Sequence, residues 1–352
     1  MTDRDETASE RLTLLGLIRK RLRSEAEVFP TSDVPTLRRR GGDFQVPPDS
    51  GLRVTWLGHA TTLVEIDGQR LLIDPVWSMR ASPVRWIGPR RFFAPPLPLD
   101  ELPEIDAVLI SHDHYDHLDR RTVTRLAKRG LRFIVPAGVG AHLTRWGVDG
   151  GQLTELTWWQ SARVGDVEVT ATPSRHFSGR SAFGRDRNRA LWAGFAMVGL
   201  EHRVYYAGDG GFFDGFEDIG SALGPFDLSL IEIGAYNRMW ADVHLGPEQA
   251  IRAHRAVRGG LLLPIHWGTF KLAFHSWTEP VERLLVEAQR TGTPIVIPRP
   301  GESIEPARAP DAQRWWPDIA WETAEEHPVV ASSTRVRGPA GSTPRDMAPV
   351  TA

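Results

Sequence analysis

The sequence predicts a layered α/β domain with mixed β-sheets, and three observations support this fold class. Residues 52–66 and 69–75 are rich in alternating apolar and β-branched residues, and Asp67-Gly68 between them is typical of a tight hairpin turn. Later in the chain, apolar runs alternate with amphipathic helical stretches, as in strands that are joined by helices. The composition, 41% hydrophobic and 24% charged over 352 residues, is that of an ordinary globular protein.

The remaining elements follow in order along the chain. A short apolar run at 107–112 predicts a buried strand that ends where a group of histidines begins. Gly130 closes the first expected helix, and Pro247 stands in the first turn of the second. We expect helices at residues 122–130, 247–259 and 279–292. We expect further β structure at residues 132–138, 166–176, 190–209, 259–267 and 294–303.

Three segments are expected. Residues 1–50 form an N-terminal segment that is partly helical, because apolar residues between Leu12 and Leu22 can form one amphipathic helix. This helix packs on the domain or frays, or else its basic face lies on a membrane surface. Residues 51–306 form the main domain. Residues 307–352 form a C-terminal extension that we expect to be largely disordered from about residue 328, where there is little to bury.

Composition and charge exclude several classes of protein. The formal net charge is −2, so no global field attracts nucleic acid. The chain has no cysteine, so any metal must be held by His, Asp and Glu. No apolar run is long enough to span a bilayer, and the acidic N-terminus is unlike a signal peptide. We therefore expect a cytoplasmic protein, with peripheral membrane contact left open.

The strongest chemical signal is the run His112-Asp113-His114-Tyr115-Asp116-His117 after the expected strand at 107–112. Residues two apart point to one side of an extended segment, so His112 and His114 can share one metal ion. Asp116 and His117 follow where the chain must turn, and they can hold a second ion. A solvated polar loop would not need three histidines and two aspartates in six residues, so we interpret the run as a metal-binding loop.

This His-x-His-x-Asp-His run resembles the signature of the metallo-β-lactamase superfamily. The other parts follow in the expected order, in TPSRH, AGDGG and LPIHWG. The resemblance covers residues 50 to 300 approximately, and it implies an αββα sandwich of two mixed sheets flanked by helices. A narrower set of blocks, including WLGHAT, LLIDPVW, AGDGGFFDGFEDIG and HWGTFKLAF, resembles the N-acylphosphatidylethanolamine phospholipase D group. The related UlaG-like lactonases share only the shorter blocks.

The resemblance implies a ligand for each position of a two-metal site. His112, His114 and His176 would hold the first metal. Asp116, His117 and His266 would hold the second, and Asp209 would bridge the two. Imidazole and carboxylate ligands suit two Zn²⁺ ions and would also accept Mn²⁺ or Fe²⁺.

Other residues are expected to act around the metals. Asp116 is expected to take part in catalysis as well as in metal binding. His244, which matches the narrower group, is expected to donate to the developing oxyanion or to protonate the leaving group, or else it packs before a helix. His59 and Asp74 are expected to orient ligands.

Substrate contacts are expected from Arg180, Lys271 and His275. Cations near His176 suit a phosphodiester, although a solvated basic loop is the alternative. Four tryptophans lie in motif regions and can line an acyl pocket, although packing in the core is the commoner role of this residue. They are Trp86, Trp192, Trp240 and Trp267.

The expected function is hydrolysis of a phosphodiester of the N-acylphosphatidylethanolamine type through a metal-bridging hydroxide. The alternatives are a UlaG-like lactonase, a cyclic-phosphate hydrolase and a non-catalytic metal-binding protein. A nuclease is disfavoured, because the sequence lacks a long basic stripe. The expected partner is a small-molecule or phospholipid substrate, and a homodimer is left open.

Overall fold

The computed structural model describes residues 27–181 and 184–336. The helix expected between Leu12 and Leu22 lies outside these residues. Between residues 27 and 51 the chain forms one short 3-10 helix, Gly41–Phe44, and otherwise runs as coil along the main domain.

Two mixed β-sheets form the centre of the fold. The seven-stranded sheet has the order β13-β1-β2-β3-β4-β5-β6, and the six-stranded sheet has the order β12-β11-β10-β9-β8-β7. The first sheet contains β1 (Leu52–Trp56), β2 (Thr62–Ile66), β3 (Gln69–Ile73), β4 (Ala107–Leu109), β5 (Phe133–Pro136), β6 (Leu153–Leu156) and β13 (Ser303–Ile304). The second contains β7 (Ser161–Val164), β8 (Val167–Thr172), β9 (Gly194–Val198), β10 (Arg203–Tyr206), β11 (Phe226–Glu232) and β12 (Gly259–Ile265).

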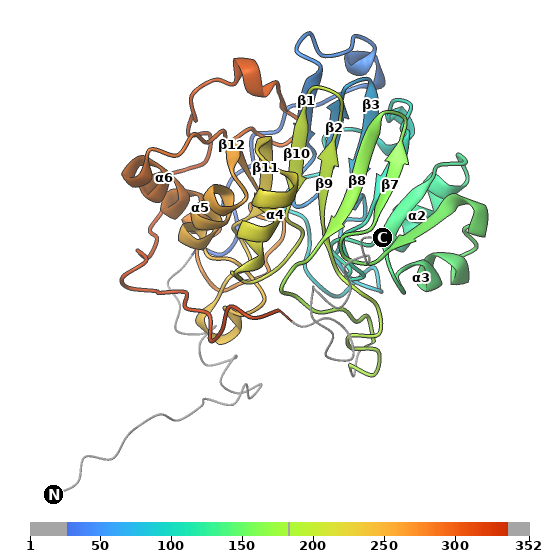
Figure 1. The fold of residues 1–352 in the computed structure, drawn as a ribbon. Coiled ribbons are helices and arrows are strands. Elements are labelled where there is room, and N and C mark those ends of the chain that lie inside the picture. The colour runs from blue at the N-terminus through green and yellow to red at the C-terminus, as the bar shows by residue number, and fades with distance from the viewer. Residues whose placement is uncertain (1–26, 182–183, 337–352) are drawn as a thin grey trace, which may run out of the picture.

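Helices cover the outer faces of both sheets. Figure 1 shows α4 (Gly215–Leu223), α5 (Pro247–Ala256) and α6 (Glu279–Thr291) on the side of β11 and β12. It shows α2 (Arg120–Ala127) and α3 (Gly140–Arg145) at the other side of the molecule. None of the described helices has the length and apolarity that crossing a membrane requires. The layers are those of an αββα sandwich, as expected.

Strand β4 shows why the fold has two cores. Ala107 and Leu109 join the cluster between the sheets, whereas Val108 and Ile110 join a second cluster that includes Val123 of α2. Successive side chains of a strand point to opposite faces, and here both faces are covered. This explains why the sequence of the strand is a continuous apolar run.

Several expectations about the elements can be compared with the structure. The hairpin is confirmed, because Ile66 pairs with Gln69 and both Asp67 and Gly68 have positive φ. The expected strand at 294–303 is mostly wrong. Only Ser303 and Ile304 form a strand, and Ile295 pairs as an isolated bridge, because the prolines nearby lack an N–H for the ladder. The elements β6, β7, β11, α3 and α4 were not predicted.

The described part of the C-terminal extension follows the surface of the domain as coil. Trp316 is buried and packs edge to face on Trp267. Although we expected disorder from about residue 328, residues 328–336 have defined contacts, including the bonds from Ser332 to the Asp242 carboxylate. Residues 337–352 lie outside the described part of the chain.

Candidate metal centre

The chemically distinctive residues lie where strands of both sheets end. Asp74 follows β3, and the run from His112 to His117 follows β4, which is parallel to β3. In the other sheet β10, β11 and β12 are parallel, so their carboxyl ends meet at one edge. Asp209 follows β10, Glu232 ends β11 and His266 follows β12 directly.

Three imidazoles converge in the first cluster. The Nδ1 atom of His114 lies 2.9 Å from Nε2 of His112 and 3.1 Å from Nε2 of His176. The Nδ1 atom of His176 donates to the Val243 carbonyl at 2.8 Å, so its Nε2 presents a lone pair to the cluster. Burial and the neighbouring imidazoles hold the pKa of His112 well below its usual range. One cation satisfies these three lone pairs, whereas shared protons cannot satisfy them all.

Two further imidazoles and a carboxylate form the second cluster. The Nε2 atoms of His117 and His266 lie 3.1 Å apart, and the Asp116 carboxylate lies 3.6 Å and 3.4 Å from them. The Nδ1 atom of His117 donates to the Asp74 carboxylate at 2.7 Å, which leaves its Nε2 free to bind. Asp74 therefore lies where it can orient the His117 ring.

Asp209 lies between the two clusters. Its Oδ2 atom is 3.1 Å from Nε2 of both His117 and His266, and 3.8 Å and 3.9 Å from Nε2 of His112 and His176. Burial opposes the charge of Asp209, but the imidazoles of His117 and His266 hold its pKa well below the usual range. One carboxylate thus reaches both groups of histidines.

The donor set fits divalent metal ions. Tetrahedral zinc with Zn–N bonds of about 2.0–2.1 Å places its ligand atoms about 3.3 Å apart. The separations in both clusters are close to this value. The seven expected ligands are therefore brought together as two groups joined by Asp209.

His59 lies beside the second cluster in a left-handed backbone conformation, with a φ of 55°. Its Nε2 atom is 3.0 Å from the Asp116 carboxylate, and the ring packs 4.0 Å from that of His266. Burial and the nearby His266 lower the pKa of His59 to about 3, so the ring is neutral. This contact orients Asp116, although His59 is close enough to belong to the ligand group itself.

His244 and Glu232 form a pair at the rim of the clusters. The Nδ1 atom of His244 donates to the buried Glu232 carboxylate at 2.7 Å and lies 4.0 Å from Asp209. Glu232 also accepts from the backbone N–H of Gly210 at 2.6 Å. Burial opposes the charge of His244, but the Glu232 carboxylate raises its pKa above the usual value. Sequence reasoning found His244 but missed Glu232, which is the last residue of a strand that was not recognised.

A cavity of about 670 Å³ opens over the clusters. His114, Asp209 and His244 lie in its wall, so the candidate metal centre is accessible from it. Arg187 and Arg238 add two cations. Most of the remaining wall is apolar and includes Phe177, Met239, Trp240, Leu272 and Val330.

The three expected substrate contacts do not line this cavity. Arg180 donates to the carbonyls of Asp113 and Leu118 and faces a different cavity. Lys271 lies over the ring of Phe29. His275 is half-buried, and its Nδ1 and Nε2 atoms each lie 2.9 Å from a backbone carbonyl, of Ser276 and Gly234. These residues are close to the motifs in the sequence, but this closeness did not predict which way their side chains point.

Of the four tryptophans, only Trp240 lines the cavity over the clusters. Trp192 and Trp267 are buried in the core, and Trp86 is 72% exposed on the surface.

Comparisons with known proteins agree with this geometry. Residues 69–267 match a family described as "Beta-lactamase superfamily domain". The chain is 51% identical to an uncharacterized protein of Mycobacterium tuberculosis, over 76% of this chain and 72% of that protein. It is 37% identical to N-acyl-phosphatidylethanolamine-hydrolyzing phospholipase D 1 of Caenorhabditis elegans, over 78% of this chain and 79% of that protein. A metallo hydrolase from Ignicoccus hospitalis shares the fold, with a TM-score of 0.54 and 23% identity over 72% of this chain and 97% of that chain.

Proposed function

The chain belongs to the beta-lactamase superfamily and is a metal-dependent hydrolase, and from this premise we propose that it hydrolyses a phospholipid phosphodiester with two metal ions. The substrate class we propose is N-acylphosphatidylethanolamine, on which the Caenorhabditis elegans relative acts by its name. The observation that carries the proposal is the position of the Asp209 carboxylate, which reaches both histidine clusters below an open cavity.

We assign His112, His114 and His176 to one metal, and Asp116, His117 and His266 to the other. Asp209 belongs to both. When bound, the metals supply a Lewis acid and a nucleophilic water at neutral pH.

The side chains around the clusters suit the two halves of such a substrate. Arg187 and Arg238 are cations in the cavity wall and can pair with a phosphate. The apolar side of the wall, with Phe177, Trp240 and Leu272, suits an acyl chain. His244 keeps Nε2 available, because Nδ1 donates to Glu232, and it can transfer a proton to the leaving oxygen.

Metal analysis together with a substrate screen tests the proposal. We expect two equivalents of metal per chain and hydrolysis of N-acylphosphatidylethanolamine in mixed micelles, with phosphatidic acid as one product. Asp209→Asn should lower metal content and reduce turnover by orders of magnitude, because an amide does not neutralise two dications. Asp106→Asn, on the surface, is the control.

Two outcomes would contradict the proposal. One equivalent of metal with full activity would remove the two-metal mechanism. Hydrolysis of lactones without any activity on phosphodiesters would keep the hydrolase and replace the substrate class.

A further inference from the structure

A second cavity, of about 880 Å³, lies on the other side of the metal-binding loop. Tyr115 and Leu118 line this cavity, whereas His114 and Asp116 of the same loop line the cavity over the clusters. The two cavities therefore flank one loop and belong to the same edge of the sandwich. Nothing in the proposed reaction uses the second one.

The wall of the second cavity is strongly basic. The two aspartates in this wall accept hydrogen bonds from neighbouring groups of the chain. Asp119 accepts from the backbone N–H and hydroxyl of Ser78 and caps α2, and Asp186 accepts from the backbone N–H groups of Arg180 and Ser181. Seven arginines line the same wall: Arg80, Arg85, Arg120, Arg121, Arg125, Arg145 and Arg180.

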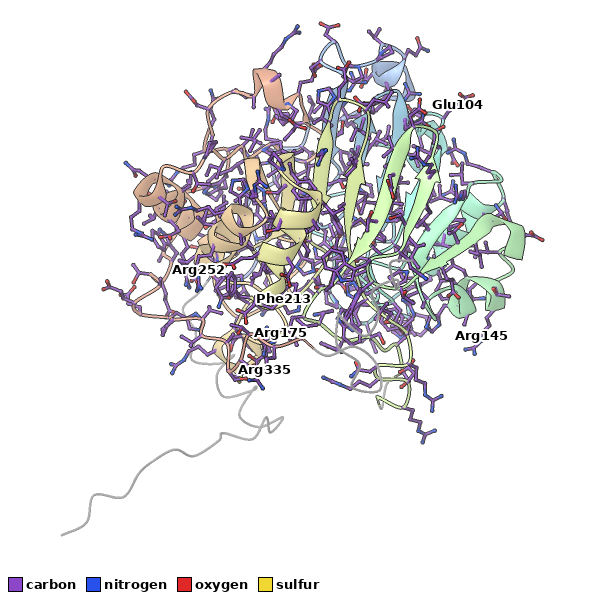
Figure 2. The ribbon with its side chains drawn as sticks, viewed as in Figure 1. Glu104, Arg145, Arg175, Phe213, Arg252 and Arg335 are labelled. Atoms are coloured by element: carbon purple, nitrogen blue, oxygen red, sulfur yellow. The ribbon has the colours of Figure 1, made fainter. Side chains whose placement is uncertain are left out.

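Four of these arginines are exposed and form no ion pair within the described chain. We name Arg85, Arg120, Arg121 and Arg145 the basic rim. Figure 2 shows Arg145, the last residue of α3, at the outer side of the molecule. Exposed cations without carboxylate partners attract anionic ligands.

The loop of residues 79–91, which carries Arg85 of the basic rim, exposes apolar side chains to water. Two backbone hydrogen bonds close the loop at its base. The Arg91 N–H donates to the Met79 carbonyl at 3.0 Å, and the Ala81 N–H donates to the Pro89 carbonyl at 3.1 Å. The buried guanidinium of Arg91 also donates to the Val76 carbonyl at 2.7 Å. At its tip Trp86 and Ile87 are 72% and 65% exposed.

Two adjacent large apolar residues on a fixed loop are unfavourable in water unless a partner covers them. Tryptophan is enriched at membrane interfaces, where its ring lies at the level of the lipid headgroups. Arginines beside it would meet the phosphates of anionic lipids. The tip and the basic rim are thus complementary to the two chemical layers of one bilayer surface.

We propose that the loop tip, Trp86 and Ile87, and the basic rim together bind the surface of a bilayer that contains anionic phospholipid. A bilayer surface is thus the partner we propose for the phospholipid hydrolase. The purpose of docking rests on the proposed function, but the docking itself does not, because binding to a bilayer needs no catalysis. Bound in this way, the edge that carries both cavities faces the lipid. A phospholipid could then reach the metal centre without crossing bulk water.

Vesicle sedimentation with the full chain tests the proposal. We compare vesicles of phosphatidylcholine alone with vesicles that also contain phosphatidylglycerol. The chain should bind only the second kind, and binding should weaken as salt is added, because the charges are exposed. Arg85→Gln/Arg145→Gln should weaken partitioning ~30-fold, and Trp86→Ser/Ile87→Ser should weaken it at least ~10-fold.

Matched controls remove the same groups from other surfaces. Arg252→Gln/Arg255→Gln removes two exposed charges from α5, which lies across the molecule from α3 (Figures 1 and 2). Leu200→Ser removes a side chain that is 75% exposed in the turn between β9 and β10. Both controls should bind vesicles as the unchanged chain does.

The outcomes separate docking from catalysis. All variants should hydrolyse a short-chain soluble phosphodiester at the unchanged rate. Vesicle binding without any hydrolysis by the unchanged chain would overturn the proposed function and leave the docking surface standing. Equal vesicle binding by the rim, tip and control variants would overturn the docking surface. Binding to an RNA oligonucleotide through the basic rim, with no binding to vesicles, would also overturn it.

Discussion

The Glu232 carboxylate determines which nitrogen of His244 faces the cavity. Glu232 is fully buried at the end of β11, where it accepts from Nδ1 of His244 and from the Gly210 N–H. A hydrogen bond at Nδ1 leaves Nε2 for the substrate. His244 and Glu232 are thus arranged as a general acid and the carboxylate that orients it. Substitution of each residue tests its role separately.

His244→Ala should retain both metals and lose about 10²- to 10⁴-fold in kcat, the usual worth of general acid catalysis. A nitrophenyl phosphodiester should lose much less, because its leaving group needs no proton. Glu232→Gln should give a smaller loss of kcat with a changed pH profile. The measurements are metal content and the kinetics of both substrates.

Loss of metal in His244→Ala would make His244 a ligand. An equal loss for both substrates would assign it to the oxyanion or to binding. Unchanged kinetics would leave it a packing residue.

A buried histidine that belongs to neither cluster should control stability in acid. His254 on α5 is buried, with Nδ1 2.8 Å from the Ser229 hydroxyl. Burial, together with the nearby Arg255, lowers its pKa from 6.5 to about 4. The unfolded state therefore binds a proton first as pH falls. The stability that neutral His254 contributes is complete above pH 6.5 and is lost as pH falls to 4.

We therefore expect His254→Gln to flatten the dependence of unfolding free energy on pH between 6.5 and 4, by about 1–3 kcal/mol. Urea unfolding of both chelator-treated chains across this range measures the difference, and chelation removes the effect of metal loss. His202→Gln, at the half-buried His202, is the comparison. Parallel curves for all chains would contradict the assignment.

The sequence located the histidines of the site better than the residues around them. His112, His114 and His117 are adjacent in the chain, and His176, Asp209 and His266 follow strands, so a topology with shared strand ends brings them together. Glu232 had no such signal. Arg180, Lys271 and His275 are near motifs, but whether a side chain faces a cavity depends on rotamers that only packing determines.

At the scale of the elements, α4 and α5 approach each other unusually closely at Gly220. A Cβ atom there would lie 2.3 Å from the Ala256 carbonyl and 2.8 Å from the Val257 backbone. Gly220 is buried within α4, where alanine would otherwise favour the helix by about 1 kcal/mol. Backbone atoms cannot move aside cheaply, so packing should outweigh propensity.

Gly220→Ala should therefore destabilise the chain by about 1–3 kcal/mol, the usual cost of overpacking. The exposed neighbour Ser221→Ala should be neutral or slightly stabilising. Thermal unfolding of both variants measures this. A more stable Gly220→Ala would mean that α4 can move away from α5 without cost.

The elements differ in how far the sequence determines them. Asp67-Gly68 fixes its hairpin because only a few residues accept positive φ. The apolar stretch 294–303 satisfied the pattern of a strand, but it has Pro294, Pro298 and Pro300, and most of it stays outside the sheet. Strand β7 is short, its residues Ser161 and Arg163 are exposed, and only Val164 is buried, so it gave no apolar signal.

At the scale of the whole molecule, the C-terminal extension is part of the folded domain and of the cavity. Trp316 donates to Glu282 of α6 at 2.7 Å, and Arg283 donates to the His327 carbonyl at 3.1 Å. Both acceptor and donor on α6 are buried, so removing the extension would leave them exposed or unpaired. Beyond residue 327, Val330 and Ser332 line the cavity over the clusters.

Graded truncations should separate these two roles. A chain ending at residue 336 keeps every described contact and is the reference. A chain ending at 327 loses the bonds of Ser332 to Asp242 and of Thr334 to Asp214 and the buried side chain of Val336, so it should stay folded with a lower melting temperature. Because it also loses cavity wall, it should raise KM several-fold for a long-chain lipid and leave KM for a short-chain substrate unchanged. A chain ending at 305 loses Trp315 and Trp316. Trp316 is buried and Trp315 is half-buried. A buried tryptophan contributes about 3–5 kcal/mol, against a total stability of about 5–15 kcal/mol. We expect that chain to be unfolded or aggregated, and Trp316→Ala in the full chain to lower the melting temperature while it stays folded. A stable, active chain ending at 305 would show that the main domain needs no cover from the extension.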